Sequence, residues 1–247
     1  RTGYEDPAAV AHERFRQWVI EDTFVADRPA WDAAGAQFFQ DVARHEHMKL
    51  RCLNGTHSTL AYLGYLAGFE TVFDATADTN FAALCQRLWK DEIVPTVPPP
   101  EGADIGAYCD TLLARYRDPS IRHRLWQIAM DGSQKLPQRI LGTIRDGLAE
   151  GRAQTGLCLV VAAWMRYVGG VDENGADIDV RDPLAERLKT ATTTDDPVRA
   201  LLAFHEVFPE DLAANDQFQN QVANWYDLLA VEGARRAVAK YLGTKTT

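Results

Sequence analysis

Apolar residues recur along most of this chain every three or four positions, the spacing that places them on one face of a helix. The first such stretch runs from Pro7 to Asp22, where a proline in the first turn costs no hydrogen bond. A longer one covers residues 37–69, and we expect an interruption near Gly55. Further stretches predict helices over residues 76–93, 105–117, 120–130, 137–151, 155–168, 197–207 and 211–242.

The alternating pattern typical of strands is scarce, so the sequence predicts a mainly α fold. The proline-rich residues 94–100 and the turn-rich residues 169–175 interrupt the helical pattern without marking a domain boundary. We find no internal repeat and therefore predict one multi-helical domain over residues 1–247. Gly64 and Gly68 lie in a predicted helix, where the missing side chains favour close contact between helices.

Composition and charge exclude several classes of function. The chain has 247 residues, 46% hydrophobic and 25% charged, as soluble globular proteins do. Its 35 acidic residues outnumber 26 basic ones, which argues against a nucleic-acid partner. The longest apolar runs are shorter than the roughly 20 residues that span a bilayer, so no membrane partner is expected. The four cysteines are far apart and no secretory leader is evident, which predicts reduced thiols in a cytoplasmic protein.

The sequence contains no glycine-rich phosphate loop, neither G-x-G-x-x-G nor G-x-x-x-x-G-K-[ST]. We therefore do not expect the chain to hold NAD or ATP by itself. His45 and His47 would point to different sides of a helix, so no metal site is predicted. The chain begins at Arg1 rather than at methionine, and we expect it to come from a longer polypeptide.

Residues 46–58 carry the polar side chains best suited to catalysis. On a helix with about 100° per residue, Glu46, Asn54 and His57 fall within about 140° of Lys49. Neighbouring leucines would desolvate the lysine and favour the neutral amine that a general base requires. The alternative is structural: Lys49 extends to solvent, Asn54 caps or breaks a helix before Gly55, and His57 is a hydrogen-bonded core residue.

The run Lys49-Leu-Arg-Cys-Leu-Asn-Gly-Thr-His57-Ser resembles the polyol-specific long-chain dehydrogenases, the family of mannitol dehydrogenase and fructuronate (mannonate) reductase. Phe15–Asp22, Arg28–Trp31 and Asp131–Arg139 also match, so the resemblance covers most of residues 7–170. It matches the family's multi-helical C-terminal substrate and catalytic domain. In that family a Rossmann-type domain, which binds NAD(H), normally precedes this one. Its absence from the chain then explains the missing phosphate loop.

The resemblance implies a role for each polar residue of the run. Lys49 is the catalytic acid/base, which takes the hydroxyl proton of a secondary alcohol while hydride leaves for the nicotinamide. Asn54 hydrogen-bonds the reacting oxygen, His57 orients the substrate or the lysine, and Glu46 relays protons between the lysine and solvent. The resemblance implies no metal, so side-chain donors would stabilise the developing alkoxide.

Three further residues bear on the substrate. By resemblance, Lys135 is a substrate-contacting lysine. Residues 126–139 look more like the uronate reductases, because the mannitol enzymes have an arginine at the place of Gln127. Lys135 and Arg139 would together hold a sugar-acid carboxylate. Arg139 would equally suit a solvated helix face, so mannonate/fructuronate and mannitol/fructose both remain open.

We therefore expect the catalytic and substrate-binding part of a metal-independent, NAD-dependent secondary-alcohol dehydrogenase. It would interconvert a polyol or an aldonate with its keto form. NAD is expected mainly on the N-terminal Rossmann-type domain of the same polypeptide, so the isolated chain is expected to be inactive. The alternative is a catalytically silent helical interaction domain that retains the family's sequence.

Overall fold

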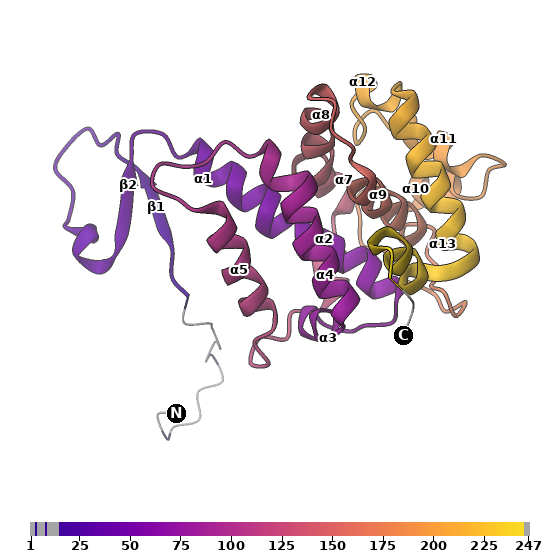
Figure 1. Ribbon diagram of the computed structural model, residues 1–247, viewed down its shortest axis with the longest axis horizontal. Helices are drawn as coiled ribbons and strands as arrows, with labels where there is room; N and C mark the ends of the chain where they lie inside the picture. Colours follow the sequence, from indigo (N-terminus) through magenta and orange to yellow (C-terminus); the bar gives the residue numbers. More distant parts are fainter. Residues whose placement is uncertain (1–2, 4–7, 9–14, 245–247) are drawn as a thin grey trace.

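The computed structural model describes residues 3, 8 and 15–244. Figure 1 shows a body of packed helices, from one end of which a two-stranded arm projects. The arm consists of β1 (Trp18–Glu21) and β2 (Ala36–Phe39), which run parallel with Trp18 opposite Ala36. The mainly helical fold that the sequence predicts is confirmed.

The remaining elements follow in chain order, with η denoting a 3-10 or π-helical segment. They are η1 (Trp31–Ala34), α1 (Ala43–Met48), η2 (Lys49–Asn54), α2 (Gly55–Thr59), η3 (Leu60–Gly64), α3 (Val72–Ala77), α4 (Thr79–Leu88), η4 (Trp89–Ile93), η5 (Val94–Thr96), α5 (Ile105–Tyr116), α6 (Leu125–Ala129), α7 (Gly132–Leu136), η6 (Pro137–Leu141), α8 (Gly142–Ala149), α9 (Thr155–Tyr167), α10 (Ala185–Ala191), α11 (Pro197–Leu202), α12 (Glu210–Ala213) and α13 (Asp216–Leu242).

The predicted helix over residues 7–22 is wrong where the structure describes it. Pro7 and residues 9–14 lie outside the described residues, and residues 18–21 form strand β1. Its partner β2 covers residues that the pattern also assigned to a helix. The runs Trp18-Val-Ile and Gln37-Phe-Phe are rich in aromatic and β-branched residues, which favour strands once a partner strand is available. That partner is distant in sequence, so helical spacing misleads here.

Gly55 does not interrupt its helix, contrary to expectation. Its φ and ψ are −62° and −48°, and α1, η2, α2 and η3 run on without a break; we call this run the 43–64 helix. Gly64 confirms the prediction of close contact, since an added Cβ would lie 2.9 Å from Leu125 Cδ1. Gly68 does not, because it has φ +83° and no atom within 4 Å of an added Cβ. Gly68 therefore ends the helix as a left-handed turn residue.

The core centres on α9, in which Gly156 to Met165 are all buried. The long helix α13 packs along it, with a kink at Gly233 (φ 79°, ψ 171°) that divides the single predicted helix. The four cysteines are free and buried. A second continuous run, α7, η6 and α8, is called the 132–149 helix below. It packs against the 43–64 helix and so joins the two sequence regions that carry the predicted site.

Candidate functional site

Lys49 and Asn54 lie in η2, a π-helical turn of the 43–64 helix. Backbone hydrogen bonds in such a turn join residues five apart, so positions i and i+5 lie nearly above one another. Lys49 and Asn54 are five apart and therefore share a face more closely than the roughly 140° of a regular α-helix. His57 follows Asn54 by three positions in α2, again on a neighbouring part of the surface. The π-helical turn thus brings Lys49 and Asn54 toward one face of the helix, and His57 follows in the next turn.

Glu46 and Lys49 are both exposed, and both line a cleft of about 910 Å³. Residues 15–19, which lead into and begin β1, and residues on α5 line it too. The expected desolvation of Lys49 by neighbouring leucines is wrong for this chain, since Leu50 and Leu53 are themselves half-buried and leave the lysine exposed. Among residues 15–244, no side-chain hydrogen bond or ion pair holds the Lys49 amine. The amine is therefore available to a ligand in the cleft.

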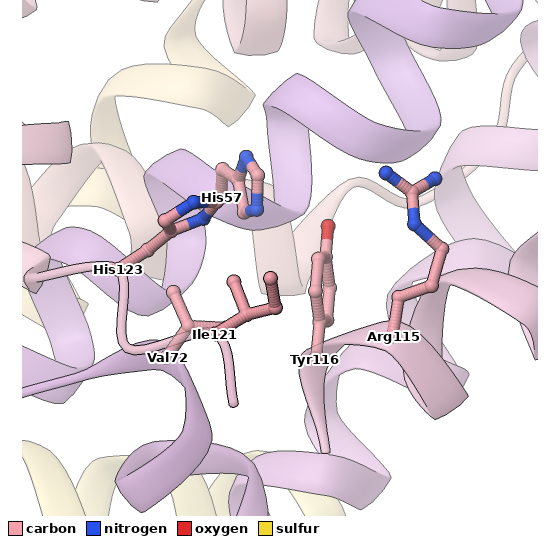
Figure 2. A pocket seen from close by; sticks show the side chains of 6 residues that line it. All are labelled: His57, Val72, Arg115, Tyr116, Ile121 and His123. Carbon is pink, nitrogen blue, oxygen red and sulfur yellow. The ribbon is translucent and has the colours of Figure 1, made fainter. Parts of the chain in front are cut away.

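His57 lies against Tyr116 and His123, as Figure 2 shows, with ring-centre distances of 4.9 and 6.3 Å. These rings line a hollow of about 30 Å³, and Arg115 lines both this hollow and the larger cleft. Burial lowers the pKa of His57 to about 3, and the nearby His123, Arg139 and Arg115 lower it as well. The imidazole is therefore neutral near neutral pH, with one donor and one acceptor nitrogen.

The sequence did not predict which side chains surround His57. The Tyr116 hydroxyl donates to the Leu53 carbonyl (3.1 Å) and shares a hydrogen bond with Thr56 Oγ1 (2.8 Å). These bonds fix the ring on which His57 packs. Tyr116 comes from α5, and His123 from the loop before α6. Neither carries a local sequence signal, because only the tertiary packing of α5 and α6 against the 43–64 helix brings them to the site.

Arg139 reaches the 43–64 helix from the 132–149 helix. Its Nη1 donates to Ser58 Oγ (3.4 Å), and its backbone oxygen would lie 3.0 Å from a Cβ added at Gly55. Glycine at position 55 thus permits the close approach of the two helices. Burial lowers the pKa of Arg139, and within residues 15–244 no carboxylate pairs with it. Arg139 therefore lies beside His57 and does not occupy the solvated helix face that the sequence left open.

Lys135 lies one turn before Arg139 and is half-buried. Its Nζ donates to the Met130 carbonyl (2.6 Å) and lies 3.9 Å from Asp131 Oδ2. Burial and then the Arg139 charge lower the pKa of Lys135, which Asp131 and Asp182 counteract. The two predicted carboxylate-binding cations are thus neighbours in space.

The other two predicted site residues are Asn54 and Gln127. Asn54 is half-buried within η2, and Gln127 is exposed on α6. Neither side chain forms a hydrogen bond with another residue of the described part of the chain. Their roles remain predictions.

The described residues give no group of three or more His, Cys, Asp and Glu side chains arranged to hold a metal ion. The open cleft beside Lys49 has room for the reacting end of a dinucleotide. The sequence contains no glycine-rich loop for the phosphates of a dinucleotide. None of the described helices has the length and apolar character to cross a bilayer.

The sequence and the helical fold of the chain match those of mannitol dehydrogenases. Residues 41–230 match the family described as mannitol dehydrogenase C-terminal domain, and the chain belongs to that family. D-mannonate oxidoreductase of Escherichia coli K12 is 49% identical over 240 residues, which make up 96% of this chain and 49% of that protein. Mannitol 2-dehydrogenase of Phaeosphaeria nodorum is 35% identical, over 97% of this chain and 42% of that protein.

A solved structure agrees with these relatives. Mannitol 2-dehydrogenase of Pseudomonas fluorescens, in a ternary complex with NAD and D-mannitol, superposes with a TM-score of 0.88 and 35% identity. The match covers 94% of this chain and 47% of that one. The chain therefore spans about half the length of the relatives it matches, which are oxidoreductases of mannitol and mannonate.

Proposed function

We propose that this chain is the catalytic and substrate-binding part of a metal-independent, NAD-dependent secondary-alcohol dehydrogenase acting on a polyol or an aldonate. The observation that carries the proposal is the exposed Lys49 amine, which lines a wide cleft together with Glu46 and shares a π-helical turn with Asn54. A general base needs a lysine that can meet the substrate hydroxyl, and Lys49 has that access. The match to oxidoreductases that contain this segment supports the proposal.

In the proposed reaction, Lys49 Nζ in its neutral form accepts the hydroxyl proton of the substrate. The Asn54 amide donates a hydrogen bond to the same oxygen and stabilises the negative charge that develops there. Neutral His57 orients a neighbouring substrate hydroxyl as donor or acceptor. Glu46, one turn before Lys49 and exposed, passes the proton to solvent. NAD, when bound, supplies the acceptor for the hydride.

We also propose that the site favours an aldonate over a neutral polyol. Arg139 is a partly buried guanidinium whose neighbourhood, within residues 15–244, contains no paired carboxylate. Lys135 adds a second cation one turn away, and the two together would hold a carboxylate of the substrate. Gln127 would contact the substrate from α6. The higher identity to D-mannonate oxidoreductase than to the mannitol dehydrogenases supports this preference.

We propose that the arm, residues 18–39, packs against a Rossmann-type domain that is a further part of the same polypeptide. Trp18 is 53% exposed and Val25 is fully exposed. Large apolar side chains exposed close together on one segment indicate a surface that another domain or protein covers. Parallel strands are normally buried in larger sheets, and an isolated pair is marginal in stability. The family match begins only at residue 41, after the arm. A domain packed there would close the cleft over Lys49 and remove water from its amine, which favours the neutral form.

The test uses a polypeptide of the relatives' length that contains this chain. With NAD, it should oxidise mannonate, and a chelator should leave the rate unchanged. Arg139→Ala should raise KM for mannonate about tenfold more than KM for mannitol, because a charge-assisted bond to the carboxylate is lost. Arg145→Ala, which removes an exposed arginine paired with Asp211, is the matched control. Absence of any turnover in the wild type would favour the silent interaction domain, and equal effects on both substrates would refute the carboxylate assignment.

A further inference from the structure

Residues 179–182 form a segment between α9 and α10. The indole Nε1 of Trp126 donates to the Asp179 carbonyl (2.7 Å), and the Arg181 guanidinium lies 4.6 Å from the centre of the Trp126 ring. Trp126 belongs to α6 and directly precedes Gln127. The segment therefore holds one of the two elements with predicted substrate contacts.

The same segment holds the start of the other element, the 132–149 helix. The Asp182 carboxylate accepts two hydrogen bonds from Ser133, from the backbone N–H (2.7 Å) and from Oγ (2.6 Å). The Leu184 N–H donates to Asp182 Oδ1 (2.9 Å) and fixes the carboxylate in turn. Asp182 thus satisfies N-terminal donors of this helix from a distant part of the chain.

Asp131, at the N-cap of this helix, does not supply such a cap. Its side chain accepts no capping hydrogen bond, and its φ of +54° lies in the left-handed region that L-residues other than glycine rarely adopt. The Asp131 N–H donates to the Arg181 carbonyl (2.8 Å). A strained conformation of this kind persists where the surroundings determine it, and here residues 181 and 182 hold both sides of the turn.

Lys135 depends on this turn for its position. It follows Ser133 by two residues, and its Nζ binds the Met130 carbonyl on the other side of the same turn. The nearby Asp182 carboxylate also counteracts the burial that lowers the pKa of Lys135. If the turn relaxed, the lysine would lose both its direction and a compensating charge.

We propose that Asp182 is a positioning residue, which fixes the Met130–Ser133 turn through Ser133 and so directs Lys135 toward the substrate. Asp182 acts through another residue and does not itself touch the substrate. The proposal rests on the proposed function, because that function makes Lys135 a substrate contact.

The kinetic test compares variants of the polypeptide of the relatives' length. Asp182→Ala should raise KM for mannonate about tenfold and leave kcat within about twofold, because the Lys49 machinery is intact. Asp182→Asn keeps one carbonyl acceptor for Ser133 and should raise KM less; it also serves as the second variant if Asp182→Ala does not fold. Asp179→Ala is the matched control, since among residues 15–244 that exposed carboxylate pairs with Arg181 alone. An unchanged KM in both Asp182 variants would overturn the proposal.

A second readout does not depend on activity. With an amine-acylating reagent and mass spectrometry, Lys135 should become labelled at least about threefold faster in Asp182→Ala or Asp182→Asn than in the wild type, because the turn no longer holds its amine. Exposed Lys189 provides the internal reference. If the wild type turned over neither substrate, the proposed function would fail, and labelling would still decide on Asp182. Unchanged labelling of Lys135 would overturn the positioning role.

Discussion

Gly132 begins the 132–149 helix at a point where the core has no room for a side chain. A Cβ added there would lie 2.5 Å from Trp164 Nε1 and 2.6 Å from the Tyr62 hydroxyl. Both rings are buried, with exposed fractions of 0% and 1%, so neither can move aside without disturbing its neighbours. Gly132→Ala should therefore destabilise the folded protein.

The expected loss follows from two opposing contributions. Overpacking of a core costs about 1–3 kcal/mol, whereas alanine in place of glycine in a helix contributes at most about 1 kcal/mol, and less at the first position. The net loss should be about 1–2 kcal/mol in the free energy of unfolding. For a chain of this size that corresponds to a fall in Tm of about 2–8 °C. Thermal unfolding followed by circular dichroism measures it.

Gly142 in the same helical run is the matched control. A Cβ there would meet the Pro137 carbonyl at 3.5 Å and Arg51 Nη2 at 3.8 Å, which are ordinary contacts. Gly142→Ala should keep or raise Tm, because the gain in helix propensity is not offset by overlap. If Gly132→Ala unfolded at the same temperature as Gly142→Ala, or above it, the packing argument would be refuted.

Two further predictions concern stability. The pKa of His57 lies at about 3 when folded and near 6.5 when unfolded, so its contribution to stability is present above pH 6.5 and is lost toward pH 3 as the unfolded chain takes up a proton. Urea unfolding at neutral pH and at about pH 5 should show that the free energy of unfolding falls less with acid in His57→Gln than in the wild type. Equal falls in both proteins would contradict the low pKa of His57. Buried Arg51 donates to the Thr96 carbonyl (2.8 Å) and pairs with Asp146. Arg51→Ala should cost about 2–4 kcal/mol of unfolding free energy, against about 0–1 kcal/mol for exposed Arg145→Ala, and similar losses in both would contradict it.

The helical body could be predicted from local sequence, because the apolar residues that form the buried face of each main helix lie close together in the chain. The run Gly156 to Met165, for example, is apolar all round and forms the central helix. The arm could not be predicted in this way, because residues 18–21 become a strand only by pairing with residues 36–39. Helix α10 was not predicted either, since only Leu188 and Ala191 of its seven residues are buried.

The candidate site also has a part that local sequence predicts and a part that depends on tertiary packing. Lys49, Asn54 and His57 are adjacent enough in sequence for the motif to be recognised. The π-helical turn that aligns Lys49 with Asn54 has no distinct spacing in sequence, so it could not be expected. The contacts of His57 with Tyr116 and of Ser133 with Asp182 depend on tertiary packing between distant elements, which no single-sequence pattern records.

The turnover of Lys49→Ala, in a polypeptide of the relatives' length, tests most directly whether Lys49 transfers the proton. Exposed Lys90→Ala, on η4 and outside the cleft, is the matched control. With NAD and mannonate, Lys49→Ala should lower kcat by about 10²–10⁴, and an added primary amine should restore part of the rate. KM should change far less, because Lys135 and Arg139 remain to hold the substrate. A Lys49→Ala enzyme that keeps the wild-type kcat would show that Lys49 is not the proton-transfer residue.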